Sequence, residues 1–522
     1  MYDNGKIYMG LAGEGEDRHR VYMHLSQSNR HGLIAGASGT GKTITMKVMA
    51  ESFSAAGVPV FLCDVKGDVS GMCEPGRDSD GMQRRIDKFG IRDVFSYRAF
   101  PTDFWDIYGR GGHPVRATVS DMGAEILSRV LSLTEIQSGV MNVIFRIADE
   151  RGLKLLDMKD LRAVIDHVAA NRAEYSLKYG NMAAQSIAAI NRALIPLEDQ
   201  GAEQFFGEPM LDIRDWMRTS RDGYGIINIL DAREVIKYPK LYAAFLLWMM
   251  AELFEVLPEV GDCDKPKLVF FFDEAHLLFD GMPKALVSKI EQVVKLIRSK
   301  GVGIYFVTQS PSDIPDTVLA QLSNRVQHAL RAYTPAEQKA VKTAASTFRP
   351  NPSFKTEDVI MNLGTGEALT SFLDEDGIPQ IVEKTAIICP QSLMAPCSEA
   401  TRASVVSSSE FSRKYDEAVD NESAYEVLEN EKKKQAEIDE IARQREELEN
   451  EKAALAAERE KAAKEEEKRL QREEEKKEKE KERKKAAAEK KSERRRAKIE
   501  TQLISAGGQI LKRGLLGILK LK

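Results

Sequence analysis

A glycine-rich segment near the amino terminus limits the fold more than any other part of this sequence. It follows the short apolar run of residues 33–35 and precedes a helix-forming stretch over residues 44–54. Glycines in this context let backbone N–H groups turn inward around phosphate oxygens at the positive end of a helix. A glycine-rich turn without a ligand is the alternative, but the flanking strand and helix favour a phosphate-binding loop. The segment reads Gly36-Ala37-Ser38-Gly39-Thr40-Gly41-Lys42-Thr43.

Two side chains of this loop have a predicted chemical role. Lys42 is expected to reach the β and γ phosphates of ATP, and the Thr43 hydroxyl is expected to bind Mg²⁺. We therefore expect ATP and Mg²⁺ as cofactors and residues 36–43 as the nucleotide-binding segment.

A second apolar run, residues 268–272, ends in the carboxylates Asp273 and Glu274. A buried strand would place Asp273 at the carboxyl edge of a sheet, where ligands bind. Asp273 is then expected to hold Mg²⁺ through water, and Glu274 to polarise the water that attacks the γ phosphate. Two acids that only cap a strand are the alternative, which the glycine-rich segment upstream disfavours. His276 follows the pair and is expected to pack or hydrogen-bond rather than catalyse.

Further candidates surround the next apolar run, residues 302–307. Gln309 follows the run and is expected to contact the γ phosphate or its water. Arg298 precedes it and is expected to stabilise transition-state charge, in a neighbouring subunit, although a surface arginine near a helix end explains it equally well. Arg325 and Arg331 are rival candidates for this role.

The charged segment Asp64-Val65-Lys66-Gly67-Asp68 follows the apolar run of residues 58–62. It should lie on the same sheet edge as the candidate site. A substrate or interface loop and a plain charged turn explain it equally well.

The order of the apolar runs predicts an α/β fold. Strand-length runs alternate with segments of helical spacing, which indicates a mostly parallel sheet covered by helices on both faces. Between residues 119 and 217 the spacing is helical with few strand candidates, which predicts a helical insertion. The predicted strands are residues 33–35, 58–62, 225–229, 268–272, 302–307 and 326–330, and the flanking helices are residues 44–54, 240–255 and 286–299.

The carboxy-terminal part of the chain has a different composition. Of the 70 residues from 431 to 500, 47 are Asp, Glu, Lys or Arg, too polar a segment to form a hydrophobic core. A long charged helix is expected, with a short heptad seam at Ile438, Ile441, Leu448 and Leu455. A seam of three heptads is marginal for a coiled coil, so both a solitary helix and a coiled coil remain open.

The last residues, 501–522, are basic and apolar. They are expected to lie on a membrane, to dock on a partner, or to dock on the chain itself. Five scattered cysteines without a Cys-x-x-Cys pair, and an amino terminus without a signal pattern, predict a soluble cytoplasmic protein.

The sequence resembles the HerA-like branch of the FtsK–HerA superfamily of P-loop ATPases, and more narrowly bacterial HerA-like proteins of unassigned function. The resemblance covers about residues 1–395. It rests on the order of several motifs: Asn29-Arg30-His31-Gly32, the glycine-rich segment, the stretch of residues 64–68, Asp273-Glu274-Ala275-His276, Thr308-Gln309-Ser310-Pro311 and Gly366-Glu367-Ala368.

This resemblance implies a RecA-like core with an extra strand between the two phosphate-site strands. It also implies a homo-hexameric ring with ATP bound between subunits, and the nucleotide-site roles for Lys42, Thr43, Asp273, Glu274 and Gln309, with Arg298 as the arginine acting in trans. Relatives pump double-stranded DNA or help a nuclease partner resect its ends. The chain departs from archaeal HerA proteins in lacking room for a full amino-terminal β-barrel and in its insertion.

The expected organisation follows the changes in pattern. We predict a short β segment at 1–30, the first part of the ATPase core at 31–118, the insertion at 119–217 and the second part of the core at 218–395. A linker at 396–409, a charged helix or coiled coil at 410–500 and a basic amphipathic tail at 501–522 complete the chain.

The leading functional hypothesis is a ring ATPase, a DNA translocase or helicase that moves or processes double-stranded DNA. The alternative is an ATP-dependent remodeller or scaffold that acts on protein or membrane partners through the charged tail. A site that binds ATP as a switch without hydrolysis is a third hypothesis, which Glu274 disfavours because binding alone needs no water-polarising carboxylate.

Overall fold

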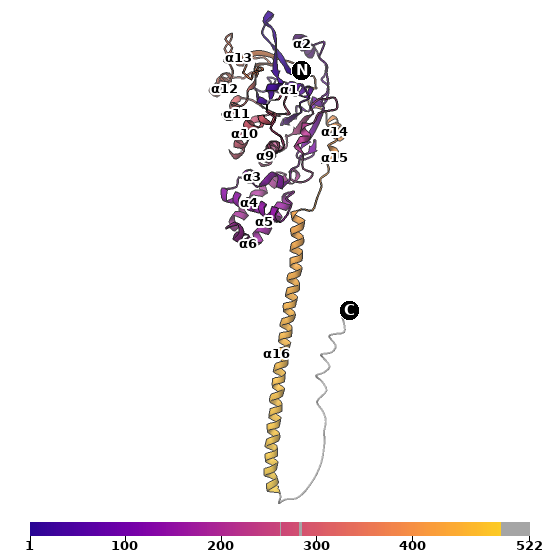
Figure 1. Ribbon diagram of the computed structural model, residues 1–522, viewed down its shortest axis with the longest axis vertical. Coiled ribbons are helices and arrows are strands. Elements are labelled where there is room, and N and C mark those ends of the chain that lie inside the picture. Colours follow the sequence, from indigo (N-terminus) through magenta and orange to yellow (C-terminus); the bar gives the residue numbers. More distant parts are fainter. Residues whose placement is uncertain (262, 281–283, 492–522) are drawn as a thin grey trace. The chain divides into compact units, whose positions relative to one another are not determined.

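The computed structural model describes residues 1–261, 263–280 and 284–491 (Figure 1). It divides into two compact units, Met1–Glu431 and a second unit that begins at Lys432. The first unit holds all of the described strands.

The strands of the first unit form a single large sheet. Its order is β1-β2-β13-β12-β11-β4-β10-β9-β5-β8-β6-β7, and β3 pairs with β2. The strands are β1 (Tyr2–Asp3), β2 (Lys6–Ala12), β3 (His19–His24), β4 (Gly32–Ala35), β5 (Val60–Asp64), β6 (Thr102–Asp106), β7 (His113–Pro114), β8 (Ile227–Asp231), β9 (Leu268–Phe272), β10 (Val302–Thr308), β11 (Asn324–Gln327), β12 (Glu367–Ser371) and β13 (Glu383–Ile387).

The centre of the sheet is parallel. All neighbouring strands from β11 through β4, β10, β9, β5 and β8 to β6 pair in parallel, whereas β12, β13, β1, β2 and β3 pair antiparallel. Strand β10 pairs with β4 on one side and with β9 on the other. The prediction of one extra strand between the two phosphate-site strands is therefore confirmed.

The apolar runs form these central strands because both faces of the sheet are covered. Side chains alternate between faces along a strand. Phe270 and Phe272 thus pack into one core and Phe271 into the other. Helix α9 covers the first face and helix α1 the second. An α/β fold with a mostly parallel, doubly covered sheet is confirmed.

Sixteen α-helices are found in the described residues. They are α1 (Lys42–Ala55), α2 (Asp80–Phe89), α3 (Val119–Val130), α4 (Glu135–Glu150), α5 (Met158–Ala170), α6 (Arg172–Tyr179), α7 (Ala184–Asp199), α8 (Ala202–Phe205), α9 (Pro239–Val256), α10 (Lys284–Leu296), α11 (Asp316–Leu319), α12 (Pro335–Ser346), α13 (Thr356–Asn362), α14 (Glu399–Ser408), α15 (Ser412–Tyr415) and α16 (Ala424–Lys491).

Helices α3 to α8 occupy the region of the predicted insertion, and Figure 1 shows α3 to α6 gathered together. Two of them begin at capping boxes: Thr134 with Gln137 for α4, and Asp157 with Asp160 for α5. Such caps satisfy backbone N–H groups that have no partner within the helix. Their buried apolar faces join the same core as α9, so the insertion packs as part of the first unit.

Residues 396–409 do not form the predicted linker. They contain helix α14, whose Val405 and Val406 pack against a core of the first unit. The serines that suggested a linker bond within the helix: Ser407 Oγ donates to the Ser404 carbonyl and Ser408 Oγ to the Val405 carbonyl, both at 3.1 Å. The serine-rich composition is therefore compatible with a helix.

The charged helix begins later than the sequence predicts, at Ala424 rather than at about residue 410. The intervening chain carries Phe411 and Tyr415, which are buried with their rings against Trp105. Through this aromatic contact, the segment between α14 and α16 packs as part of the first unit.

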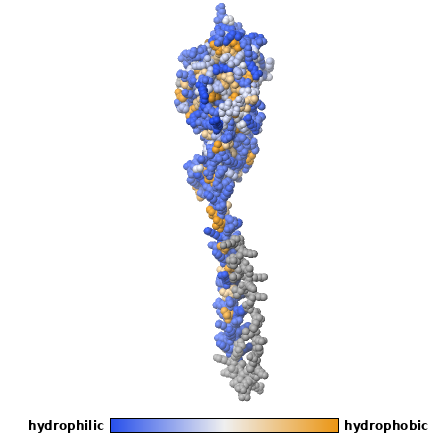
Figure 2. Space-filling model, turned by 90° about the vertical axis from the view of Figure 1, so that its right-hand side faces the viewer, coloured by the Kyte–Doolittle hydropathy of each residue, from blue (hydrophilic) through white to orange (hydrophobic). Residues whose placement is uncertain are grey.

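Over its described residues, the second unit consists of the part of helix α16 from Lys432 onward. Figure 2 shows a mainly hydrophilic helix surface with small, separate hydrophobic patches. Ile438, Ile441, Leu448 and Leu455 of the predicted seam are exposed there. The coiled coil stays a prediction, and the tail at residues 501–522 lies outside the described residues.

Within the described parts of the chain, no helix has the length and apolar character needed to cross a membrane. The strongly apolar helix α9 is instead buried in the first unit, with Phe245 and Trp248 fully covered.

Candidate functional site

The glycine-rich loop connects β4 to α1 at the carboxyl edge of the sheet. Gly36, Gly39 and Gly41 have φ values of 153°, 75° and 116°, which are rare for other residues. A Cβ on Gly36 would lie 2.5 Å from Cβ of His328. Glycine is therefore required at this position by both conformation and space.

His328 supports the loop from behind. Its Nε2 lies 2.8 Å from Thr45 Oγ1 of helix α1 and its Nδ1 lies 2.9 Å from the carbonyl of Glu367. Burial lowers the pKa of His328 to about 4, so the ring is neutral at pH 7. The N–H of Gly366 also donates to the Thr40 carbonyl, at 3.0 Å. The late motif around Gly366 thus supports the phosphate loop.

Lys42 is folded over its own loop. Its Nζ donates to the carbonyl of Gly36 at 2.6 Å and to that of Ala37 at 3.1 Å. Burial, together with the charge of Lys66, lowers its pKa, and the carboxylates of Glu274 and Asp273 oppose this shift. The ammonium group is thus held at the mouth of the loop, where a phosphate would meet it.

The acidic pair stands at the end of β9, as the sequence predicts. Asp273 and Glu274 are 4% and 7% exposed. Burial raises the pKa of Asp273 to about 6. Glu274 has a φ of 47°, an uncommon conformation for a residue with a side chain. Such backbone strain is concentrated at functional positions.

Three side chains surround the carboxylate of Glu274. Lys66 forms an ion pair with it, and Gln309, which directly follows β10, lies close enough to help lower its pKa. His276 Nδ1 lies 3.2 Å from Glu274 Oε2. Burial alone would raise the pKa of Glu274, but the hydrogen bond and charge of Lys66 outweigh it and hold this pKa below its ordinary value.

The residues expected at a magnesium site also come together. Thr43 Oγ1 donates to Asp68 Oδ2 at 3.2 Å. Three carboxylate oxygens nearby, Asp68 Oδ1, Asp273 Oδ2 and Glu274 Oε2, are buried without a hydrogen-bond partner. Unpaired buried oxygens are costly unless a ligand compensates them. Mg²⁺ prefers oxygen ligands and usually keeps several waters, so the residues fit this ion.

The described residues contain no cluster of three or more His, Cys, Asp or Glu side chains able to hold a metal.

The three arginine candidates lie in different places. Arg298 belongs to the 3₁₀ helix Ile297–Lys300 before β10, at the sheet edge opposite its own phosphate loop. Arg325 is half-buried and donates to the carbonyls of Leu322 and Thr347, at 2.8 and 2.6 Å. Arg331 is exposed and donates to the Met361 carbonyl at 3.0 Å. The hydrogen bonds of Arg325 and Arg331 in the described parts of the chain go to these backbone carbonyls and not to the acidic pair.

The comparison with protein families agrees with this arrangement. The family model described as helicase HerA-like, C-terminal, matches residues 10–522. The chain belongs to this HerA-like family. A search of the curated proteins finds no match.

Solved structures similar to this HerA-like chain include the plasmid coupling protein TrwB in complex with the non-hydrolysable GTP analogue GDPNP. It has 14% sequence identity and a TM-score of 0.49, and the match covers 72% of this chain and 90% of that one. VirB4 of Thermoanaerobacter pseudethanolicus has 14% identity and a TM-score of 0.44, covering 74% and 97%. Both TM-scores are below 0.5, so family membership rests on the family model.

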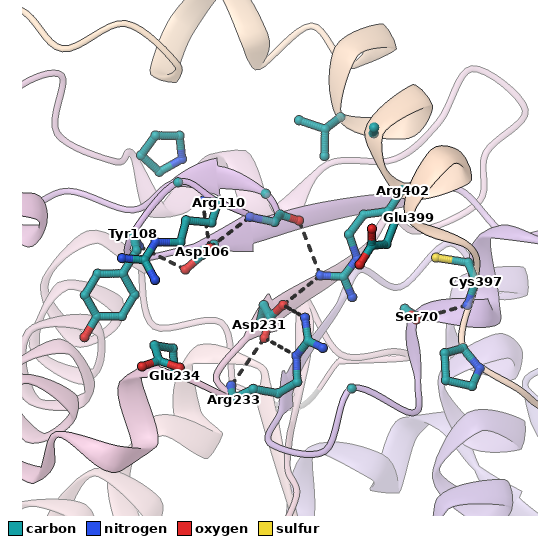
Figure 3. Close-up of a pocket in the computed structure, with 18 of the residues that line it drawn as sticks. Ser70, Asp106, Tyr108, Arg110, Asp231, Arg233, Glu234, Cys397, Glu399 and Arg402 are labelled. Atoms are coloured by element: carbon teal, nitrogen blue, oxygen red, sulfur yellow. Dashed lines mark hydrogen bonds and ion pairs between the residues drawn. The ribbon is translucent and has the colours of Figure 1, made fainter.

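A hollow of about 1020 Å³ in the HerA-like chain lies over the ends of β6 and β8 (Figure 3). Several of the charged side chains that line it are paired with one another. Asp231 Oδ1 accepts from Arg233 Nε at 2.9 Å and Asp231 Oδ2 from Arg402 Nη1 at 2.8 Å. Asp106 accepts three backbone N–H groups of the following loop. None of the predicted nucleotide-site residues is among the described lining of this hollow.

Two site residues of the HerA-like chain, Lys66 and Asp68, belong to the charged segment that the sequence places at this sheet edge, but the sequence assigns neither side chain a role in the nucleotide site. Their segment follows β5, which ends at the same sheet edge as β9, and this position is the signal that points to the site. The sequence leaves a substrate loop and a charged turn open. The structure places Lys66 against Asp273 and Glu274, and Asp68 against Thr43.

Proposed function

We propose that this HerA-like chain hydrolyses ATP at the site formed by residues 36–43, Asp273 and Glu274. The observation that carries the proposal is the juxtaposition, at one sheet edge, of the glycine-rich loop with a strained and buried Glu274. Backbone N–H groups of the loop and Lys42 bind the phosphates. Thr43 and Asp273 hold Mg²⁺, which when bound neutralises charge that develops on the phosphate oxygens.

Glu274 orients the attacking water and accepts its proton. Its depressed pKa keeps it ionised at neutral pH, as a proton acceptor requires. Gln309 directly follows β10, the strand between β4 and β9, and from this position beside Glu274 it contacts the γ phosphate or the attacking water. A site that only binds ATP needs no such proton acceptor, so the presence of Glu274 favours hydrolysis over a binding switch.

The proposal also covers the work for which the ATP hydrolysis is used. The chain acts as a homo-hexameric ring of the HerA type and uses hydrolysis to move or process double-stranded DNA. Membership of the HerA-like helicase family supports this. Arg298 lies at the opposite edge from its own loop, a position compatible with action on the site of a neighbouring subunit.

Steady-state ATP hydrolysis with and without linear duplex DNA, at low and moderate salt, tests the proposal. We expect hydrolysis that rises with DNA and is salt-sensitive, because contacts to phosphates weaken as salt increases. Lys42→Ala, the control, should be inactive under both conditions. A hydrolysis rate that does not change with DNA of any form would contradict the proposal of a DNA motor. It would favour the alternative of an ATP-dependent remodeller or scaffold that acts on protein or membrane partners.

A further inference from the structure

Lys66 interacts with both carboxylates that the reaction needs. Its Nζ lies 3.7 Å from Asp273 Oδ2 and forms an ion pair with Glu274 Oε1. Burial alone would lower the pKa of Lys66, but the hydrogen bond of Glu274 and the nearby carboxylates raise it. The ammonium of Lys66 therefore keeps its positive charge beside the two acids.

The backbone of the Lys66 segment is held in place. Asp64 Oδ1 accepts the N–H groups of Lys66 at 3.2 Å and Gly67 at 2.6 Å, and Asp64 Oδ2 accepts that of Val69 at 3.4 Å. Gly67 has a φ of 81° and packs against Arg233, where an added Cβ would lie 2.9 Å from Arg233 Cδ. Movement of Lys66 is therefore limited mainly to its side chain.

That side chain is free to move into solvent. It is 42% exposed, whereas those of Asp273 and Glu274 are 3% and 9% exposed. Exposed lysine ion pairs are weak, so the contact can be exchanged for another cation at little cost. One oxygen that faces Lys66, Asp273 Oδ2, is also buried without a hydrogen bond.

We propose that Lys66 is a positioning residue that neutralises Asp273 and restrains Glu274 in the nucleotide-free site, and that it is displaced when the site takes up a divalent cation with its nucleotide. This inference rests on the proposed function. Two cations cannot share Asp273 Oδ2 without strong repulsion, because like charges a few ångströms apart destabilise each other. Glu274 is thus released for its water only when metal and nucleotide are present.

The test measures metal dependence of binding rather than turnover. Mg²⁺ is titrated into protein and a fluorescent ADP analogue, and the Mg²⁺ concentration at half-saturation is compared between wild type and Lys66→Met. We expect this concentration to fall about two- to fivefold in the variant, since a competing exposed cation is removed. Binding of the analogue in EDTA should not change, and Lys66→Arg should behave as wild type.

Lys6→Met is the matched control. Lys6 is also 42% exposed and pairs with a glutamate, Glu375, at 3.1 Å, but far from the site. It should leave the Mg²⁺ titration unchanged. Thermal melts establish that each variant is folded, and Lys66→Gln replaces Lys66→Met if the latter is not.

Three results would overturn the inference. One is an unchanged or higher half-saturating Mg²⁺ concentration in folded Lys66→Met protein. Another is selective loss of affinity for a non-hydrolysable ATP analogue with normal binding of ADP, which would make Lys66 a γ-phosphate ligand. Wild-type protein that binds no nucleotide would overturn the proposed function as well, whereas a failure of hydrolysis alone leaves this titration valid.

Discussion

Two groups of charged residues share the carboxyl edge of one sheet, yet they differ in how their charges are satisfied. In the hollow over β6 and β8, Asp231 is paired with Arg233 and Arg402. At the nucleotide site, Asp273 and Asp68 each keep a buried oxygen without a hydrogen bond. The carboxylate of Asp231 in the hollow is thus satisfied by protein groups, whereas the buried oxygens at the nucleotide site are left for a ligand. Unsatisfied polarity, rather than cavity size, marks the functional site here.

The largest expected effect is a loss of ATP turnover that occurs when the nucleotide site is changed and not when the hollow is changed. Glu274→Gln should lower ATP turnover by about 10²- to 10⁴-fold, the usual contribution of a general base, while nucleotide binding is preserved. Steady-state hydrolysis and titration with a fluorescent ADP analogue measure the two quantities.

Glu234→Gln in the hollow is the matched control, and it should hydrolyse ATP like the wild type. Normal turnover by Glu274→Gln would remove Glu274 from catalysis and with it the contrast between the two regions.

The second prediction compares the stability of the same substitution in each region. Asp231→Asn should lower the free energy of unfolding by about 3 kcal/mol, because it leaves Arg233 and the largely buried Arg402 without their carboxylate. Asp273→Asn should instead raise it by about 1 kcal/mol, because burial makes the ionised Asp273 unfavourable in the nucleotide-free protein. Urea unfolding at pH 7 measures both. Equal losses would show that Asp273 is as well satisfied as Asp231.

The third prediction concerns pH and the two buried histidines nearest these regions. His328, behind the phosphate loop, bonds to a hydroxyl and a carbonyl, whereas His113 bonds to the carboxylate of Asp416 at 2.7 Å. The pKa of His328 is about 4 when folded and about 6.5 when unfolded. The unfolded state therefore binds more protons between these values, and stability present above pH 6.5 is lost as the pH falls towards 4.

His328 should contribute a loss of about 2 kcal/mol between pH 7 and pH 5. Unfolding of wild type and His328→Gln at both pH values measures it, and the variant should lose less stability on acidification. An unaltered pH dependence would mean that His328 is not held neutral. His113→Gln is the control for loss of a buried ring.

The smallest expected effect tests the support of the metal site. Asp68→Asn weakens the partner of the Thr43 hydroxyl and removes the charge of a buried oxygen near the site. Loss of such a supporting group usually costs about tenfold in metal affinity. The Mg²⁺ concentration at half-saturation should rise accordingly, with binding in EDTA unchanged. Asp106→Asn in the hollow should leave this concentration as in wild type.

Much of the fold is predictable because its central strands are buried on both faces. Residues 268–272 form a continuous apolar run, which predicts a strand buried on both faces. Because Asp273 follows this run directly, its position at the carboxyl edge of the sheet is also predictable. Strand β6 is missed because Asp103 and Asp106 interrupt its apolar pattern. Strands β12 and β13 are missed because polar and apolar residues alternate in short antiparallel pairs.

The candidate site is predictable to the same extent. The glycine-rich loop and the acidic pair carry local signatures, and the structure brings them together. Lys66 and Asp68 carry no comparable signal, because a charged turn looks alike whether or not it faces a ligand. Their contacts depend on β5 lying beside β9, a pairing that joins segments about 200 residues apart in sequence.

The most direct test of the proposed nucleotide site is to locate the bound metal ion in a crystal structure. Crystals of the full chain with a non-hydrolysable ATP analogue and Mn²⁺ in place of Mg²⁺ would show the ion by its anomalous scattering. We predict a single strong peak beside Thr43 and on the side of Asp273, with the phosphates of the analogue in the loop of residues 36–43. A nucleotide-associated peak in the hollow beside Asp231 and Arg402, with the loop empty, would contradict it.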